Sequence, residues 1–162
     1  MLLLRVLTGS RLFGFHTPSS DWDYLEVTDS TVRRGHTLAD TDGAQWGLGT
    51  FMRVASKSSH NALDAMFAPD EFCEVDVIKD LRHGFRCDRV AAYKRFTATI
   101  DGVSGSTAKD PLKKTIFGEL LQYNLQILWK NGRYDPTAFR KTLRGKELHE
   151  ERLRQWEEAH HD

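Results

Sequence analysis

The sequence has no long apolar run and few cysteines. No stretch of the 162-residue chain approaches the roughly 20 apolar residues that a membrane-spanning helix requires. The opening Met1-Leu2-Leu3-Leu4 has neither the charged start nor the long apolar centre of a signal peptide. Cys73 and Cys87 are the two cysteines, and a chain of this length needs no disulfide framework. We therefore expect a cytoplasmic protein with reduced thiols and no membrane partner.

An excess of one charge is also missing. The 23 Lys and Arg residues balance the 23 Asp and Glu residues, so the overall charge supplies no attraction to nucleic acid. No Ser-His-Asp or Cys-His grouping indicates nucleophilic catalysis. His83, Cys73 and Cys87 lack the fourth ligand that a structural zinc site uses. Composition therefore indicates one globular domain, or a small domain with a helical extension.

The first part of the chain predicts an α/β (α+β) fold. Residues 2–7 form an apolar strand, and residues 22–28 form a second strand rich in aromatic and β-branched side chains. We expect a short helix capped by Ser10 between them, and a third strand over 37–42. From Trp46 onward, apolar residues recur at helical spacing.

The rest of the chain predicts helices. Their expected ranges are 61–67, 70–81, 88–101 and 111–129, followed by a last helix capped by Asp135-Pro136. Pro111 suits a helix start and Asn131-Gly132 a helix end. We therefore expect a small mixed sheet with helices in residues 1–69, and a helical extension packed on it in residues 70–162.

The segment Gly9-Ser10-Arg11-Leu12-Phe13-Gly14 has the composition of a phosphate cradle. Glycine lets the backbone approach a phosphate closely, and the amides at a helix start point towards an anion. The Ser10 hydroxyl adds a donor and Arg11 adds a nearby cation. This segment is therefore a candidate nucleotide-binding turn.

Two carboxylates follow in Ser20-Asp21-Trp22-Asp23. Because side chains alternate along a strand, we expect Asp21 and Asp23 on one face, with Leu25 and Val27 continuing that face into the core and Glu26 opposite. Adjacent carboxylates repel each other unless a cation such as Mg²⁺ lies between them. A solvated acidic pair at a strand edge is the simpler interpretation of each motif alone, but the conjunction of both motifs favours a catalytic site.

The two motifs together resemble the signature of the DNA polymerase β-like nucleotidyltransferase superfamily. The similarity is greatest to predicted nucleotidyltransferases, some associated with RNA repair, whose motif is Gly-Ser-Arg-x-(aromatic)-Gly followed by Ser-Asp-x-Asp. Beyond the motif, Asp42 precedes Trp46 by the spacing seen in such relatives, and Ser58 to Met66 resembles their Ser-Asn-Pro-x-x-Leu-Glu-x-Leu segment. The resemblance covers roughly residues 3 to 69.

The resemblance implies a site as well as a fold. Asp21 and Asp23 would bind Mg²⁺, with Mn²⁺ as the alternative. Asp42 would be the third carboxylate, which would act as a metal ligand or as the general base that activates the acceptor hydroxyl; Asp40 is the second choice. The residues implied to bind the nucleotide are Gly9, Ser10, Arg11 and Ser20.

The implied reaction is transfer of NMP from a nucleoside triphosphate (NTP) to a hydroxyl of RNA, a protein or a small molecule, with release of pyrophosphate. The alternative is a catalytically weakened binding or regulatory protein of a toxin–antitoxin or phage system. Thr50, Gly118 and Leu121 favour this alternative, because relatives tend to have Lys, His and Arg there.

Overall fold

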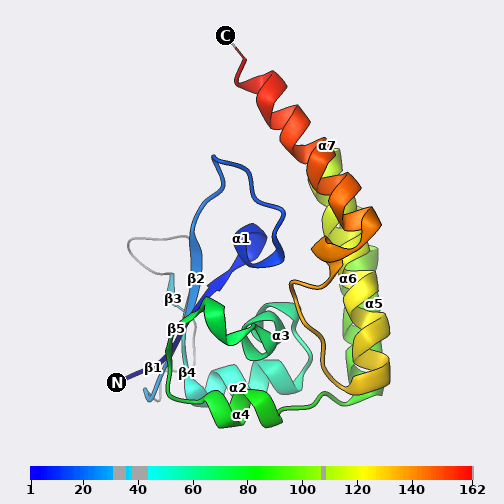
Figure 1. Ribbon diagram of the computed structural model, residues 1–162. Coiled ribbons are helices and arrows are strands. Elements are labelled where there is room, and N and C mark those ends of the chain that lie inside the picture. The colour runs from blue at the N-terminus through cyan, green and yellow to red at the C-terminus, as the bar shows by residue number, and fades with distance from the viewer. Residues whose placement is uncertain (31–35, 38–43, 107–108, 162) are drawn as a thin grey trace.

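A computed structural model describes residues 1–30, 36–37, 44–106 and 109–161. Within these residues the strands form one five-stranded mixed sheet with the order β3-β4-β2-β1-β5, and the helices lie between the strands and after them along the chain (Figure 1). In chain order the strands and α-helices are β1 (Leu2–Thr8), α1 (Gly9–Phe13), β2 (Asp23–Thr28), β3 (His36–Thr37), β4 (Ala44–Gly47), α2 (Leu48–Ser56), α3 (His60–Phe67), β5 (Cys73–Asp76), α4 (Lys79–Gly84), α5 (Arg89–Ser104), α6 (Pro111–Asn131) and α7 (Leu143–Ala159).

The central strands β1 and β2 are antiparallel and confirm the two predicted strands. Their register pairs Val6 with Leu25 and Thr8 with Asp23. Alternation places Leu25 and Val27 in the core, where they are buried. On the opposite face, Glu26 forms an ion pair with Arg5, as the strand period predicts.

Two expected helical segments prove to be strands. Trp46 lies on β4, which is parallel to β2, and α2 begins only at Leu48. The expected helix over 70–81 is wrong, because Cys73–Asp76 instead forms β5 at the edge of the sheet, antiparallel to β1. Pairing with an open strand edge outweighs weak helical periodicity in such short segments. The sheet therefore uses residues on both sides of position 69.

The predicted helix ends are confirmed for α6 and wrong for α7. Asp110 caps α6 by accepting a hydrogen bond from the Lys113 backbone N–H (3.1 Å), and Gly132 ends the helix with a positive φ of 74°. The last helix begins later than expected, with Thr142 as its cap. Asp135 instead closes a turn, accepting hydrogen bonds from the backbone and hydroxyl of Thr137.

Helix α3 lies between the sheet and the helices α5 and α6, which pack side by side (Figure 1). Helix α4 is fixed to this core by Arg82, whose side chain is fully buried. Its guanidinium donates hydrogen bonds to the carboxylates of Asp70 and Asp76 and to the backbone carbonyls of Met66 and Ala68. The buried charge of Arg82 therefore has carboxylate and carbonyl partners, as a stable interior requires.

A second apolar cluster joins the N-terminal and C-terminal parts of the chain. Phe15, just after α1, packs with residues of α6 and α7 and with Phe139; the other members are Ile116, Leu120 and Leu148. The expected mixed α+β fold with a C-terminal helical region is confirmed. Among the described residues, no helix is both long enough and apolar enough to cross a membrane.

Candidate functional site

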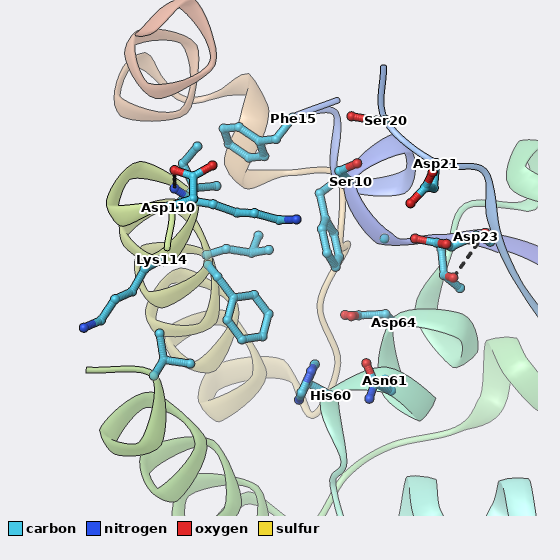
Figure 2. A pocket seen from close by; sticks show the side chains of 18 of the residues that line it. Ser10, Phe15, Ser20, Asp21, Asp23, His60, Asn61, Asp64, Asp110 and Lys114 are labelled. Atoms are coloured by element: carbon cyan, nitrogen blue, oxygen red, sulfur yellow. Dashed lines mark hydrogen bonds between the residues drawn. The ribbon is translucent and has the colours of Figure 1, made fainter. Parts of the chain in front are cut away.

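A cleft of about 1150 Å³ opens between the sheet, α3 and the helices α6 and α7. We call its sides the acidic wall, the basic wall and the floor. The acidic wall contains Gly9, Ser10, Ser20, Asp21 and Asp23; the basic wall contains Lys109, Lys113 and Arg152; the floor contains His60, Asn61 and Asp64. Figure 2 shows Asp110, at the start of α6, across this cleft from Asp21 and Asp23.

The acidic wall forms where β1 ends and β2 begins. Because Thr8 is paired with Asp23, the next residue, Gly9, lies against the Asp23 carboxylate. Gly9 has a positive φ of 70°, and a Cβ atom there would lie 2.7 Å from Oδ2 of Asp23. The Thr8 hydroxyl also donates a hydrogen bond to the Asp23 carbonyl oxygen (3.2 Å). Glycine is therefore required here for its backbone angle and for the space that the carboxylate occupies.

The two predicted acids both line the cleft, although not through a common strand. Since β2 starts at Asp23, Asp21 lies in the preceding loop, and the expectation that strand alternation aligns them is wrong. Figure 2 nevertheless shows both carboxylates beside Ser10, directed into the same part of the cleft. The loop brings the acids together where the sheet was expected to do so.

The two predicted serines also line the cleft. Ser10 is a residue of α1, whose cap position is Thr8, so the expected capping role of Ser10 is wrong. Figure 2 shows the Ser10 side chain beside the two acids. The Ser20 hydroxyl accepts a hydrogen bond from the Thr17 backbone N–H (2.8 Å), which closes a tight turn in the loop before Asp21.

Arg11 takes a different position from the predicted one. It is not among the residues that line the cleft. Its Nε and Nη2 donate hydrogen bonds to the Ser20 carbonyl oxygen (3.2 and 3.0 Å), and its guanidinium stacks 3.9 Å from the centre of the Trp22 ring. Arg11 therefore holds the loop between α1 and β2, which in turn positions Asp21.

The predicted third carboxylate, Asp42, and the second choice, Asp40, both lie outside the described residues. Among the residues that are described, no group of three or more His, Cys, Asp or Glu side chains is arranged to hold a metal ion. The donor set of Asp21 and Asp23 fits Mg²⁺, which is commonly held by one or two carboxylates together with water and substrate phosphate oxygens.

The basic wall was not predicted as a unit. Within the described part of the chain, Lys109, Lys113 and Arg152 form no ion pair. Nε of Arg152 is buried without a hydrogen-bond partner among these residues. Lys114 has a separate role: its Nζ donates to the Ser106 carbonyl oxygen (2.7 Å), and its side chain points away from the acids (Figure 2).

Sequence patterns could not identify Arg152, because its position depends on how α7 docks. His149 accepts a hydrogen bond from Arg140 Nε (3.0 Å), and its Nε2 lies 3.0 Å from the His16 carbonyl oxygen. Trp156 donates from Nε1 to the Ser19 hydroxyl (2.8 Å). Two residues of α7, two helical turns apart, thus hold the loop between α1 and β2 by hydrogen bonds.

The pKa of His16, in the loop between α1 and β2, is affected by several nearby cations, Arg152 of the basic wall among them. The pKa of His16 is lowered, first by burial and then by the positive charge of Arg11, with His149, Arg140 and Arg152 adding to it. His16 is therefore neutral at pH 7, and the positive charge in this region belongs to the arginines.

The floor is supplied by successive turns of α3. Asn61 and Asp64 are three positions apart, so both can face the cleft. Asp64 is 5% exposed, and it accepts a hydrogen bond from the Tyr134 hydroxyl (2.6 Å). Burial raises the pKa of Asp64 to about 7, although the Tyr134 hydrogen bond opposes this shift. His60 packs edge-on against the Phe117 ring, with centroids 5.3 Å apart.

Comparisons of the chain with family models, with curated proteins and with solved structures found no match.

Proposed function

We propose that this protein is a metal-dependent nucleotidyltransferase, which transfers NMP from an NTP to an acceptor hydroxyl and releases pyrophosphate. The observation that carries the proposal is the polarity of the cleft. One wall presents two carboxylates beside a glycine turn. The opposite wall presents three cations that form no ion pair among the described residues, together with the carboxylate of Asp110, which caps α6. A triphosphate complexed with a divalent cation complements both walls at once.

The acidic wall suits the metal. Asp21 and Asp23 would hold Mg²⁺, or Mn²⁺ in its place, and the ion would supply charge neutralisation to the phosphate oxygens when bound. Gly9 leaves room for the Asp23 carboxylate, and the Ser10 hydroxyl lines the cleft, where it could donate a hydrogen bond to a phosphate oxygen.

The basic wall suits the rest of the triphosphate. Lys109 extends from the segment before α6, Lys113 from the first turn of α6, and Arg152 from α7. A guanidinium can donate two parallel hydrogen bonds to phosphate, whereas a lysine acts as a point charge. These residues would neutralise and orient the phosphates, and positioning of this kind supplies most of the catalysis in phosphoryl transfer.

The test has a binding step and a transfer step. Calorimetry measures binding of each NTP with Mg²⁺. Each α-labelled NTP is then incubated with the protein, Mg²⁺ or Mn²⁺ and total RNA, and label is sought on RNA and on protein while pyrophosphate is measured. Asp21→Asn with Asp23→Asn should abolish both binding and transfer. A matched control combines Glu71→Gln with Asp101→Asn, which removes two exposed carboxylates that do not line the cleft.

Two outcomes contradict the proposal in different ways. Full transfer activity in the Asp21 and Asp23 double variant would exclude the assigned metal site. Binding of Mg²⁺ and NTP without pyrophosphate release for any acceptor would instead indicate the binding or regulatory protein that is the alternative here.

A further inference from the structure

The floor of the cleft contains a carboxyl group that the metal site does not use. Asp64 lies on α3, and Figure 2 shows its carboxyl directed into the cleft below Ser10 and Asp23. It is 95% buried by its surroundings, since only 5% of the residue is exposed. Burying a carboxyl group destabilises the folded protein unless the group has a partner. An apolar residue of similar size would stabilise this position as well or better, so stability alone does not account for the carboxyl.

We propose that Asp64 is the general base that takes the proton from the acceptor hydroxyl. This inference rests on the proposed nucleotidyltransferase function, and it leaves Asp42 the role of a metal ligand. Three features of the geometry support it: the carboxyl faces the cleft that contains the metal acids, Tyr134 fixes its orientation through a 2.6 Å hydrogen bond, and the exposed Asn61 lies one helical turn away on the same cleft surface.

The proposed step balances as follows. The acceptor hydroxyl oxygen forms a bond to the α-phosphorus of the NTP, and the bond from that phosphorus to the bridging oxygen of pyrophosphate breaks. The hydroxyl proton passes to the ionised carboxylate of Asp64. The products are the nucleotidylated acceptor, pyrophosphate and neutral Asp64, which returns its proton to solvent. The Asn61 amide is placed to hold the acceptor hydroxyl before transfer.

The protonation state of Asp64 suits this role. Burial raises its pKa to about 7, and the Tyr134 hydrogen bond, which favours the ionised form, limits the rise. A base whose pKa lies near the working pH combines a sizeable ionised fraction with a useful driving force. Asp64 therefore has the environment of a tuned base rather than that of a surface acid.

Burial and the Tyr134 hydrogen bond set the pKa of Asp64, and most other titratable groups near α3 are neutral or already paired. Cys87 is neutral, since burial raises its pKa to about 11, and His60 has its pKa lowered by burial and by Arg95. The charged groups of α4 and β1 are engaged with other acids. These pairs are Arg82 with Asp70 and Asp76, and Arg5 with Glu26 and Glu74. Arg53 of α2 lies on the exposed side of its helix, and Figure 2 shows Asp23 on the acidic wall above Asp64.

The test compares Asp64→Asn with Tyr134→Phe and with the control Glu71→Gln. The first variant keeps an oxygen to accept the Tyr134 hydrogen bond but cannot take a proton. Calorimetry with Mg²⁺ and a non-hydrolysable α,β-methylene NTP measures binding. Pyrophosphate release with α-labelled NTP and total RNA measures kcat from pH 5.5 to pH 9.

The expected results separate base catalysis from a structural role. Asp64→Asn should bind the analogue as the wild type does, lose at least about 100-fold in kcat, and lose the acidic limb of the pH profile. Tyr134→Phe should move that limb to higher pH, so that its activity is recovered by raising the pH. Glu71→Gln should leave the profile unchanged.

Two different failures are distinguishable. Normal analogue binding with an unchanged kcat or an unchanged acidic limb in Asp64→Asn would overturn the role of Asp64 alone. A wild-type protein that neither binds the analogue nor releases pyrophosphate would overturn the proposed function, and the role of Asp64 with it.

Discussion

The carboxylate of Asp23 occupies the space in which a side chain on Gly9 would lie. The virtual Cβ of Gly9 is 2.7 Å from Oδ2 of Asp23, closer than non-bonded atoms approach. The register of β1 and β2 creates this contact, because it pairs Thr8 with Asp23 at the end of the sheet. The turn and the acid are therefore one structural unit, and a change in either should affect both.

Gly9→Ala should weaken Mg²⁺-dependent NTP binding by at least about tenfold, because the new methyl group displaces the Asp23 carboxylate and a left-handed backbone costs an L-residue roughly 1–2 kcal/mol. Calorimetry with and without Mg²⁺ measures the effect. Gly118→Ala is the matched control: it lies within α6, nothing lies within 4 Å of its virtual Cβ, and it should bind normally. Unimpaired binding in Gly9→Ala would contradict the assigned cradle.

Arg152→Gln should raise the Kd for NTP about ten- to hundredfold, the range expected when a hydrogen bond to a charged group is lost. The wild-type affinity should also fall more steeply with salt than that of the variant. Arg154→Gln is a suitable control, because Arg154 lies on the same helix and pairs with Glu151. Equal effects of the two substitutions would mean that Arg152 contributes only general positive charge.

Asp42→Asn should lower transfer at least about 100-fold, because the family resemblance implies that Asp42 is a third metal ligand, and a catalytic metal supplies several kcal/mol of charge stabilisation. Asp40→Asn should retain most activity. Steady-state kinetics of pyrophosphate release compares them, and circular dichroism checks that both variants fold. The reverse order of the two effects would assign the third carboxylate to Asp40.

Asp64→Asn should change the pH dependence of stability. The folded-state pKa of Asp64, about 7, lies above the ordinary value of 3.8, so the folded protein binds the proton more tightly than the unfolded chain. The stabilisation is complete below about pH 4 and is lost as the pH rises to about 7. Relative to the wild type, the variant should therefore gain about 3 kcal/mol in free energy of unfolding between pH 5 and pH 8.

Urea denaturation at both pH values measures this difference, and Glu71→Gln should show none. A pH-independent difference between Asp64→Asn and the wild type would show that the Asp64 carboxyl titrates alike in the folded and unfolded states.

Arg82→Met should lower the free energy of unfolding by about 3 to 5 kcal/mol, the usual effect of removing one partner from a buried ion pair. The loss leaves the carboxylate of Asp76 and the carbonyl oxygens of Met66 and Ala68 without their donor. Urea denaturation measures the change. Arg89→Met, an exposed substitution, should change stability by less than about 0.5 kcal/mol.

The local parts of the fold could be predicted from sequence. Apolar strands at β1 and β2 and the helix from Pro111 to Asn131 follow from patterns within a few residues. The edge strand β5 could not be predicted, because Cys73–Asp76 takes its conformation from pairing with β1. The same holds for Trp46, whose strand depends on parallel pairing with β2.

The candidate site divides in a similar way. Gly9, Ser10, Asp21 and Asp23 are close in sequence, and their conjunction carried the prediction. Arg152 reaches the cleft only through the docking of α7, which no local pattern encodes. The significance of Asp64 depends on Tyr134, which is distant in sequence and supplies the hydrogen bond that orients the carboxyl.

The bonds from α7 to the loop between α1 and β2 have a consequence for synthesis of the chain. His149 and Trp156 hold carbonyl and hydroxyl oxygens of His16 and Ser19. The ribosome makes the glycine turn and its acids first, but it makes the residues that anchor their loop more than a hundred positions later. A nascent chain can thus form its sheet early, while the cleft acquires its final shape only after Trp156 has been added.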